Sequence, residues 1–196
     1  MLNLLITNGQ IIDGTGSGGY YGSVAVEDER LTILRGDVSY IQAARTISAN
    51  GRVVCPGFID LYAHSGLVML TEPLHEPKVR QGITTELIGV DGNSYAPFYS
   101  QASFDQFLEM NSGLDGAPIL QKRWSSVAEY LDMFDGLVAV NVAYIIGNAP
   151  LRIETVGWDN RRAAGLELEN MKAMLREAME EGAFGISTGL DYPPGS

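Results

Sequence analysis

The sequence predicts an α/β protein made of a small N-terminal β unit and about the first four βα units of a TIM-type (β/α) barrel. About the first fifty residues hold short apolar runs separated by turn residues, which is typical of hairpins. From Val53 onward, apolar strands alternate with longer helical stretches, which is typical of a parallel sheet. A complete barrel takes about 250 residues, and roughly 140 follow the β unit. We therefore expect a β unit over residues 1–54 and a half-barrel over residues 55–196.

Two hairpins are expected in the β unit. "LLITNGQII" sets two apolar runs around Asn8-Gly9, and "GSVAVEDERLTIL" repeats the pattern. The glycine-rich run "GTGSGG" at residues 14–19 fits a dinucleotide-binding pattern, but a strand-like sequence follows it, whereas a phosphate site needs a helix there. We interpret this run as a surface turn.

Strands and helices are expected to alternate in the second part. Four strands are predicted, at residues 53–62, 84–90, 138–146 and 183–188. A helix is predicted at residues 166–182, ending at Gly182, with an apolar stripe at three-and-four spacing made of Leu168, Met171, Leu175, Ala178 and Met179. Residues 97–135 contain "SFDQFLEM" and "SVAEYLDMF", which predict one or two helices forming a lid or an outer layer.

Charge and composition limit the partners. Thirteen basic residues against 24 acidic residues give a net charge of -11, which repels nucleic acid and anionic membrane surfaces. The opening "MLNLLITNGQII" has no basic region and no apolar run long enough for a signal peptide or a membrane span. The single cysteine suits a reducing compartment, so we expect a cytoplasmic protein.

Polar residues follow each predicted strand. In "PGFIDLYAHSG", Asp60, Tyr62 and His64 are spaced two apart, so an extended strand would project them from one face. A histidine in place of Tyr62 would complete a His-x-His metal clamp. The second strand ends at Asp91, the third at "IIGNAPLR" and the fourth at "STGLDYPPGS". Barrel enzymes build their active sites at these carboxyl ends.

Several motifs carry a resemblance to a known family. "LLITNGQIIDGTG" together with "ISANGRVVCPGFIDLYAHSG" resembles the amidohydrolase superfamily. "RQGITTELIGVDGNSYAP" and "EEGAFGISTGLDYPPGS" resemble its N-acyl-D-amino-acid deacylase (D-aminoacylase) branch, of which this chain would be the N-terminal portion. The resemblance implies metal-dependent hydrolysis of N-acyl-D-amino acids, small-molecule substrates, by a zinc-activated water.

The resemblance also implies roles for five residues. His64 matches the second histidine of the clamp, and Asp91 stands where many deacylases have a metal-bridging cysteine, so both are candidate metal ligands. Asp60 would support them as a hydrogen-bond acceptor. Tyr62 replaces the first histidine of the clamp, and Asn148 stands where the family has a histidine. The catalytic aspartate of the family is expected beyond residue 196, so no catalytic or substrate-binding residue is assigned.

The remaining candidate ligands are few. His64 and His75 are the only histidines, and catalytic zinc usually takes three protein ligands. His75 lies in the proline-flanked "EPLHEPK" and is predicted to be a surface or loop-packing residue. Cys55, nine residues before His64, would lie at the opposite end of the strand as a buried thiol. We therefore doubt that this chain alone is occupied by zinc, and we expect it to be inactive.

Three hypotheses follow from these observations. The chain is part of an enzyme that needs further residues, or a non-catalytic remnant that binds a small ligand or a partner without metal. The third alternative is another amidohydrolase, such as a dihydroorotase-like cyclic amidase, against which "GVDGNSYAP" and "STGLDYPPGS" argue. A half-barrel also leaves sheet edges open, which predicts self-association.

Overall fold

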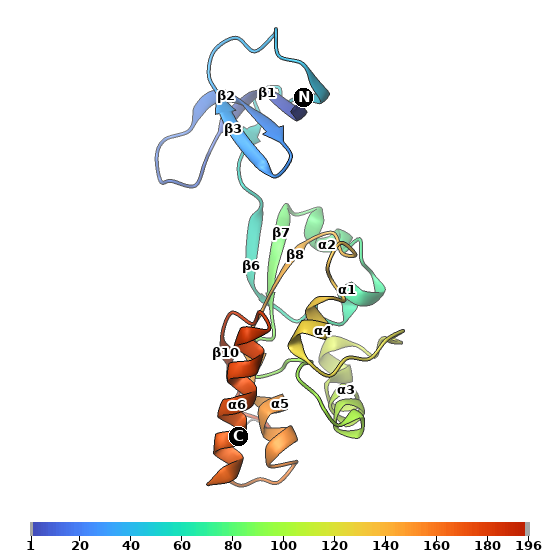
Figure 1. The fold of residues 1–196 in the computed structure, drawn as a ribbon. Helices are drawn as coiled ribbons and strands as arrows, with labels where there is room; N and C mark the ends of the chain where they lie inside the picture. The colour runs from blue at the N-terminus through green and yellow to red at the C-terminus, as the bar shows by residue number, and fades with distance from the viewer. Residues whose placement is uncertain (1, 195–196) are drawn as a thin grey trace. The chain divides into compact units, whose positions relative to one another are not determined.

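The computed structural model describes residues 2–194. These residues form two compact units, of which the first ends at Gly57 and the second begins at Phe58 (Figure 1). The short strand β5 (Val53–Val54) pairs with the first strand and so belongs to the first unit.

A five-stranded sheet forms the first unit. Besides β5, its strands are β1 (Leu2–Ile11), β2 (Tyr20–Glu27), β3 (Arg30–Leu34) and β4 (Ala43–Ser48). Their order is β3-β2-β1-β4, with β5 also beside β1. The β1–β2 and β2–β3 pairs are antiparallel, and β1 pairs in parallel with both β4 and β5.

The hairpin predicted at Asn8-Gly9 is wrong. β1 runs straight through this dipeptide, and the pairing register with β2 shifts between Ile6 and Gly9. Asn8 has φ of 55°, a left-handed conformation that asparagine tolerates in a β-bulge as well as in a turn. The second predicted hairpin is confirmed, with a turn between the paired residues Glu27 and Arg30. The glycine-rich run is an exposed connection leading into β2, as expected.

Parallel strands form the sheets of the second unit. They are β6 (Phe58–Ala63), β7 (Ile83–Ile88), β8 (Asn141–Tyr144), β9 (Ile146–Gly147) and β10 (Ile186–Ser187). One sheet has the order β6-β7-β8, and β9 pairs with β10. Only Ile145 separates β8 from β9, and its N–H donates to the carbonyl of Ile88 on β7. The strands predicted at residues 84–90, 138–146 and 183–188 are confirmed, whereas the one predicted at 53–62 is divided into β5 and β6. The described strands form open sheets.

Six helices lie in the described part of the second unit: α1 (Val68–Thr71), α2 (Glu76–Val79), α3 (Gln101–Asp115), α4 (Val127–Leu131), α5 (Asn148–Thr155) and α6 (Leu166–Glu180). The predicted helix α6 is confirmed, and Gly182, with φ of 114°, lies just after its end. Its predicted apolar stripe is only partly covered, because Ala178 is buried whereas Leu168 and Met179 are 42% and 44% exposed. Met174, which lies outside that stripe, is buried.

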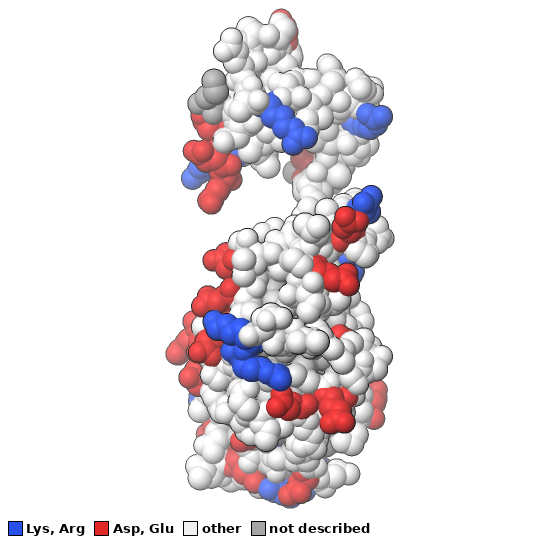
Figure 2. Space-filling model, turned by 90° about the vertical axis from the view of Figure 1, so that its right-hand side faces the viewer, with Lys and Arg blue, Asp and Glu red and all other residues white. Residues whose placement is uncertain are grey.

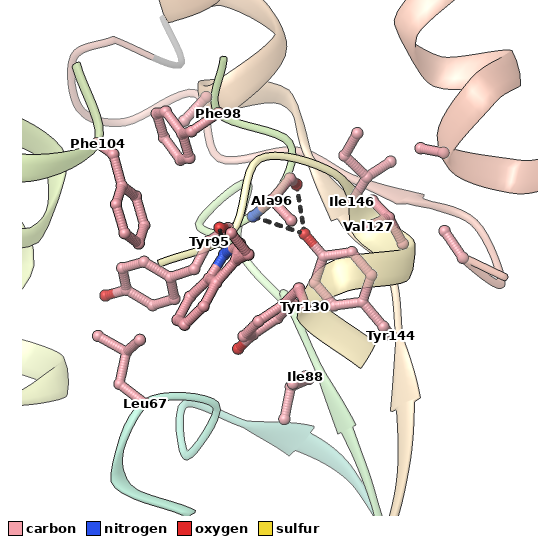
Figure 3. Packing of buried hydrophobic residues seen from close by; sticks show 14 of the residues in the cluster. Leu67, Ile88, Tyr95, Ala96, Phe98, Phe104, Val127, Tyr130, Tyr144 and Ile146 are labelled. Carbon is pink, nitrogen blue, oxygen red and sulfur yellow. Dashed lines mark hydrogen bonds between the residues drawn. The ribbon is translucent and has the colours of Figure 1, made fainter. Parts of the chain in front are cut away.

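Aromatic side chains dominate the core of the second unit (Figure 3). Many come from the segment between β7 and β8, including the buried residues Phe98, Phe104, Phe107, Trp124 and Tyr130. Tyr130 stands edge-on to Tyr144 of β8, with ring centroids 5.4 Å apart. The hydroxyl of Tyr144 accepts from the N–H of Ala96 at 3.2 Å and donates to its carbonyl. The one or two helices predicted within residues 97–135 are confirmed as α3 and α4, which turn apolar side chains into this core.

Acidic side chains are spread over the surface drawn in Figure 2, in keeping with the excess of 24 acidic over 13 basic residues. Within residues 2–194, no helix combines the length and the apolar character needed to cross a bilayer.

Large apolar side chains are exposed on two strands of the second unit. On β6, Phe58, Ile59 and Leu61 are 58%, 62% and 68% exposed. Near β10, Phe184 and Leu190 are 75% and 66% exposed. We call these five residues the open apolar edges. Such surface is usually covered in soluble proteins.

Candidate functional site

His64 and Asp91 meet at the carboxyl ends of β6 and β7. These strands are parallel neighbours, with Ala63 opposite Ile88. His64 directly follows β6, and Asp91 lies in the turn after β7. His64 Nε2 lies 3.3 Å from Asp91 Oδ2. The two predicted ligands are thus brought together.

Glycines allow this turn to pack against the ends of the other strands. Gly92 has φ of 73°, and a Cβ there would overlap Asn148 Oδ1. Asn148 is buried and accepts a hydrogen bond from the N–H of Gly189 at 3.2 Å. The N–H of Gly92 donates to Ser187 Oγ at 3.0 Å. Asn148 therefore ties together the loops that follow β7, β9 and β10.

Tyr62 binds the carboxylate that faces His64. Its hydroxyl donates to Asp91 Oδ2, the same oxygen that His64 approaches. The rings of Tyr62 and His64 stand edge-on, with centroids 5.6 Å apart. The hydrogen bond to Asp91 raises the pKa of Tyr62, because it stabilises the neutral phenol. The tyrosine is therefore held as a neutral donor on Asp91.

Asp60 does not join this pair. The pairing register of β6 with β7 shifts between Asp60 and Ala63, which interrupts the even alternation expected from the sequence. The carboxylate of Asp60 binds Lys78 of α2 and accepts the backbone N–H of Tyr62 at 3.0 Å. The hydrogen bond from Lys78 lowers the pKa of Asp60, and the same bond raises the pKa of Lys78.

One neighbour of His64 was not predicted from the sequence. Asp115, the last residue of α3, places Oδ1 3.5 Å from His64 Nδ1, and Tyr95 donates its hydroxyl to Asp115 Oδ2. The side chain of Asp115 is only 2% exposed. Burial raises the pKa of Asp115, and the hydrogen bond from Tyr95 opposes that shift. A carboxylate at a helix end, far along the chain from the strand ends, belongs to no recognisable motif.

The other histidine lies in a separate buried polar cluster. His75 is 7% exposed, and its Nε2 lies 3.0 Å from Oε1 of Glu86, which is fully buried. Lys78 Nζ lies 3.3 Å from the same oxygen, and Ser65 donates to the other. His75 therefore packs a loop against β7, as one half of its prediction stated, and is not a surface residue.

The prediction of a buried thiol at Cys55 is wrong. Cys55 is exposed. The predicted strand is broken into β5 and β6, and Cys55 lies in the connection between them.

The described residues do not form a complete zinc site. Within residues 2–194, no group of three or more His, Cys, Asp or Glu side chains could hold a metal ion. Two ligands of a tetrahedral zinc at about 2.0–2.1 Å lie roughly 3.3 Å apart. The observed 3.3 Å between His64 Nε2 and Asp91 Oδ2 fits that spacing. These two atoms could thus be part of a site, but a third protein ligand is missing and the hydroxyl of Tyr62 already binds the carboxylate.

Comparison of sequences finds whole-chain similarity to deacylases. The N-acyl-D-aspartate deacylase of Alcaligenes xylosoxydans xylosoxydans is 36% identical over 195 residues, covering 99% of this chain and 38% of the relative. The N-acyl-D-glutamate deacylase of the same organism is 34% identical with the same coverage. The chain therefore spans less than half the length of these relatives. No family model matches it.

Comparison of structures finds deacylases as well. N-acyl-D-glutamate deacylase from Bordetella bronchiseptica, complexed with zinc and a phosphonate inhibitor, matches with a TM-score of 0.83 and 32% identity, over 99% of this chain and 40% of that one. A D-aminoacylase matches with a TM-score of 0.81 and 32% identity, over 100% and 40%. An L-hydantoinase from Arthrobacter aurescens, with a TM-score of 0.61 and 17% identity, shares the fold alone.

The chain is a mixed α/β protein with open sheets, and its fold matches that of solved deacylases of the amidohydrolase type. Within that class, the chain is homologous over its whole length to the N-terminal portion of the N-acyl-D-amino-acid deacylases. The resemblance stated from the motifs is confirmed.

Proposed function

We propose that this chain is the N-terminal portion of a metal-dependent amidohydrolase that cleaves the amide bond of N-acyl-D-amino acids. In this proposal, β6 to β10 are the first strands of its barrel. The observation that carries it is the meeting of His64 and Asp91 at the carboxyl ends of adjacent parallel strands, in a chain similar throughout to three deacylases.

His64 and Asp91 would be the chain's contribution to the metal site. A zinc ion in such a site polarises the amide carbonyl and lowers the pKa of a bound water to about 7. The third ligand and the catalytic acid would come from residues other than those described. Asp60, through the backbone of Tyr62, and Asn148, through the loops, would hold the strand ends in place.

The isolated chain should therefore be inactive. Purified 196-residue chain with excess zinc should release no amino acid from N-acetyl-D-aspartate or N-acetyl-D-glutamate above a blank. Turnover in independent preparations that disappears in His64→Ala would contradict this expectation.

A chimera tests the proposed activity directly. This chain would replace the matching 38% of the Alcaligenes N-acyl-D-aspartate deacylase, with Tyr62→His introduced to complete the clamp. We expect zinc-dependent release of D-amino acid that is lost when His64→Ala is added. A folded, zinc-loaded chimera that hydrolyses no N-acetyl-D-amino acid would contradict the proposal. The parent deacylase serves as the positive control.

The bond from Tyr62 to Asp91 favours a second candidate, a metal-free unit that binds a small ligand or a partner. It predicts a well-folded chain that takes up no zinc even in the Tyr62→His variant. We place either form in the cytoplasm, a location supported by a single, exposed cysteine.

A further inference from the structure

We propose that Asp115 is a positioning residue. Its carboxylate accepts a hydrogen bond from Nδ1–H of His64 and thereby directs the other ring nitrogen, Nε2, toward Asp91. The inference rests on the proposed role of His64 as a metal ligand. Asp115 Oδ1 lies 3.5 Å from His64 Nδ1, a separation that a small rotation of the ring would shorten to a hydrogen bond.

Asp115 Oδ1 requires a hydrogen-bond donor because it is buried. Asp115 Oδ1 is buried and has no hydrogen-bond partner in the described part of the chain. The other oxygen of the same carboxylate is already bound by Tyr95, which fixes the orientation of the group. A buried acceptor without a donor is unfavourable, so the nearest ring N–H is expected to point at it.

Little room is left for a competing donor. The cavity between His64 and Asp115 has a volume of about 10 Å³, at the lower limit for one water molecule. Asn93 and Tyr130 line the same cavity. Asn93 has a buried oxygen without a partner among the described residues, and Asp115 Oδ1 receives no hydrogen bond from the Tyr130 hydroxyl. Nδ1–H of His64, 3.5 Å away, is the donor that we assign to it.

Asp91 does not require a hydrogen bond from Nε2 of His64. Its side chain is 40% exposed, and its Oδ2 accepts the hydroxyl of Tyr62. Solvent and Tyr62 can satisfy it whether or not Nε2 carries a proton. The ring nitrogen that faces Asp91 is therefore the one free to bind a metal, while a carboxylate holds the other, an arrangement common around metal-binding histidines.

Nitrogen-15 NMR of the metal-free chain tests the inference, because the chain has only two histidines. At about pH 8.5, we expect Nδ1 of His64 to carry a proton in the wild type. In Asp115→Asn, Tyr95 should donate to the amide oxygen and leave the NH₂ group facing Nδ1. The Nδ1 proton should then be lost from most of the population, and the resonances of His75 should not change.

Asp105→Asn is the matched control, because Asp105 is an exposed carboxylate on the same helix. It should leave His64 unchanged. An unprotonated Nδ1 in the wild type, or a proton retained in folded Asp115→Asn, would overturn the inference. The wild-type spectrum alone decides the point if the variant does not fold. The NMR experiment measures neither zinc binding nor turnover. A chimera without activity would therefore not contradict the role of Asp115, and a negative NMR result would not contradict the proposed hydrolysis.

Discussion

At the level of single residues, Tyr62 controls what can reach the pair formed by His64 and Asp91. Coordination by tyrosine requires a phenolate, which at pH 7 costs about 4 kcal/mol for an ordinary pKa near 10. The hydrogen bond to Asp91 raises the pKa of Tyr62 further. A neutral imidazole needs no deprotonation to coordinate. The tyrosine therefore opposes metal binding both by its chemistry and by the place it occupies.

Replacing Tyr62 with histidine should strengthen zinc binding. We expect Tyr62→His to bind zinc at least about tenfold more tightly than the wild type by isothermal titration, because the new histidine adds a third metal ligand to His64 and Asp91. Hydrolysis by the isolated chain should still be absent.

Tyr21→His controls for an added histidine elsewhere, since Tyr21 is 76% exposed in the first unit. It should leave the zinc affinity unchanged. Tight binding in the wild type that weakens in Tyr62→His would mean that Tyr62 is itself a ligand.

Only part of the site could be predicted from the sequence. His64 and Asp91 follow apolar strands directly, so parallel pairing brings them together. Asp60 was expected beside His64, but a shift in register, which leaves no trace in an alternating sequence, separates it from the pair. Asp115 escaped prediction because its position depends on how α3 packs, which no local pattern specifies.

At the level of elements, a partly buried ionic cluster joins β6, α2 and β7. Lys78 of α2 binds Asp60 of β6 and lies 3.3 Å from Glu86 of β7. Glu86 is fully buried, so removing one partner would leave an uncompensated charge inside the protein. The cluster thus fixes α2 against the two strands that carry the candidate site.

The charge of Asp60 should make the stability of the wild type depend on pH. Asp60→Asn should lower the free energy of unfolding by about 1–2 kcal/mol near pH 7. The folded-state pKa of Asp60 lies below its ordinary value of 3.8. The contribution of its charge is therefore complete above that value and is lost as the pH falls through the lowered pKa. The difference between wild type and variant should shrink below about pH 4.

Urea unfolding between about pH 2.5 and 7.5 measures this difference. Asp105→Asn, which removes an exposed ion pair with Arg123, should change stability by less than about 0.5 kcal/mol. A difference for Asp60→Asn that stays constant, or that grows as the pH falls, would contradict the assigned role.

Strands and helices were easier to predict than turns. The βα alternation of the second unit and helix α6 follow from periodicity that burial enforces. The dipeptide Asn8-Gly9 tolerates positive φ, which favours a turn and a β-bulge equally. The pairing of β1 with β4 and β5 decides for the bulge.

At the level of the whole molecule, the open apolar edges defined above predict self-association. We expect light scattering to show a mass that increases with protein concentration. Ile59→Lys combined with Leu61→Lys should reduce the association, because two charges would have to be buried on β6. Both side chains are more than half exposed, so the fold should tolerate the change.

Ile119→Lys is the control, since Ile119 is 84% exposed and lies in the connection between α3 and α4, outside the strands. It should not alter the mass. A monodisperse monomer at every concentration would show that the apolar edges are not used for association.

The position of Trp124 gives the two units different optical signatures. Both tryptophans, Trp124 and Trp158, belong to the second unit, and residues 1–57 contain none. Trp124 is 2% exposed and stacks on Tyr130, with ring centroids 4.7 Å apart. Tryptophan fluorescence therefore follows the unfolding of the second unit alone, whereas far-ultraviolet circular dichroism follows both. Any offset between the two curves measures how far one unit can unfold while the other stays folded.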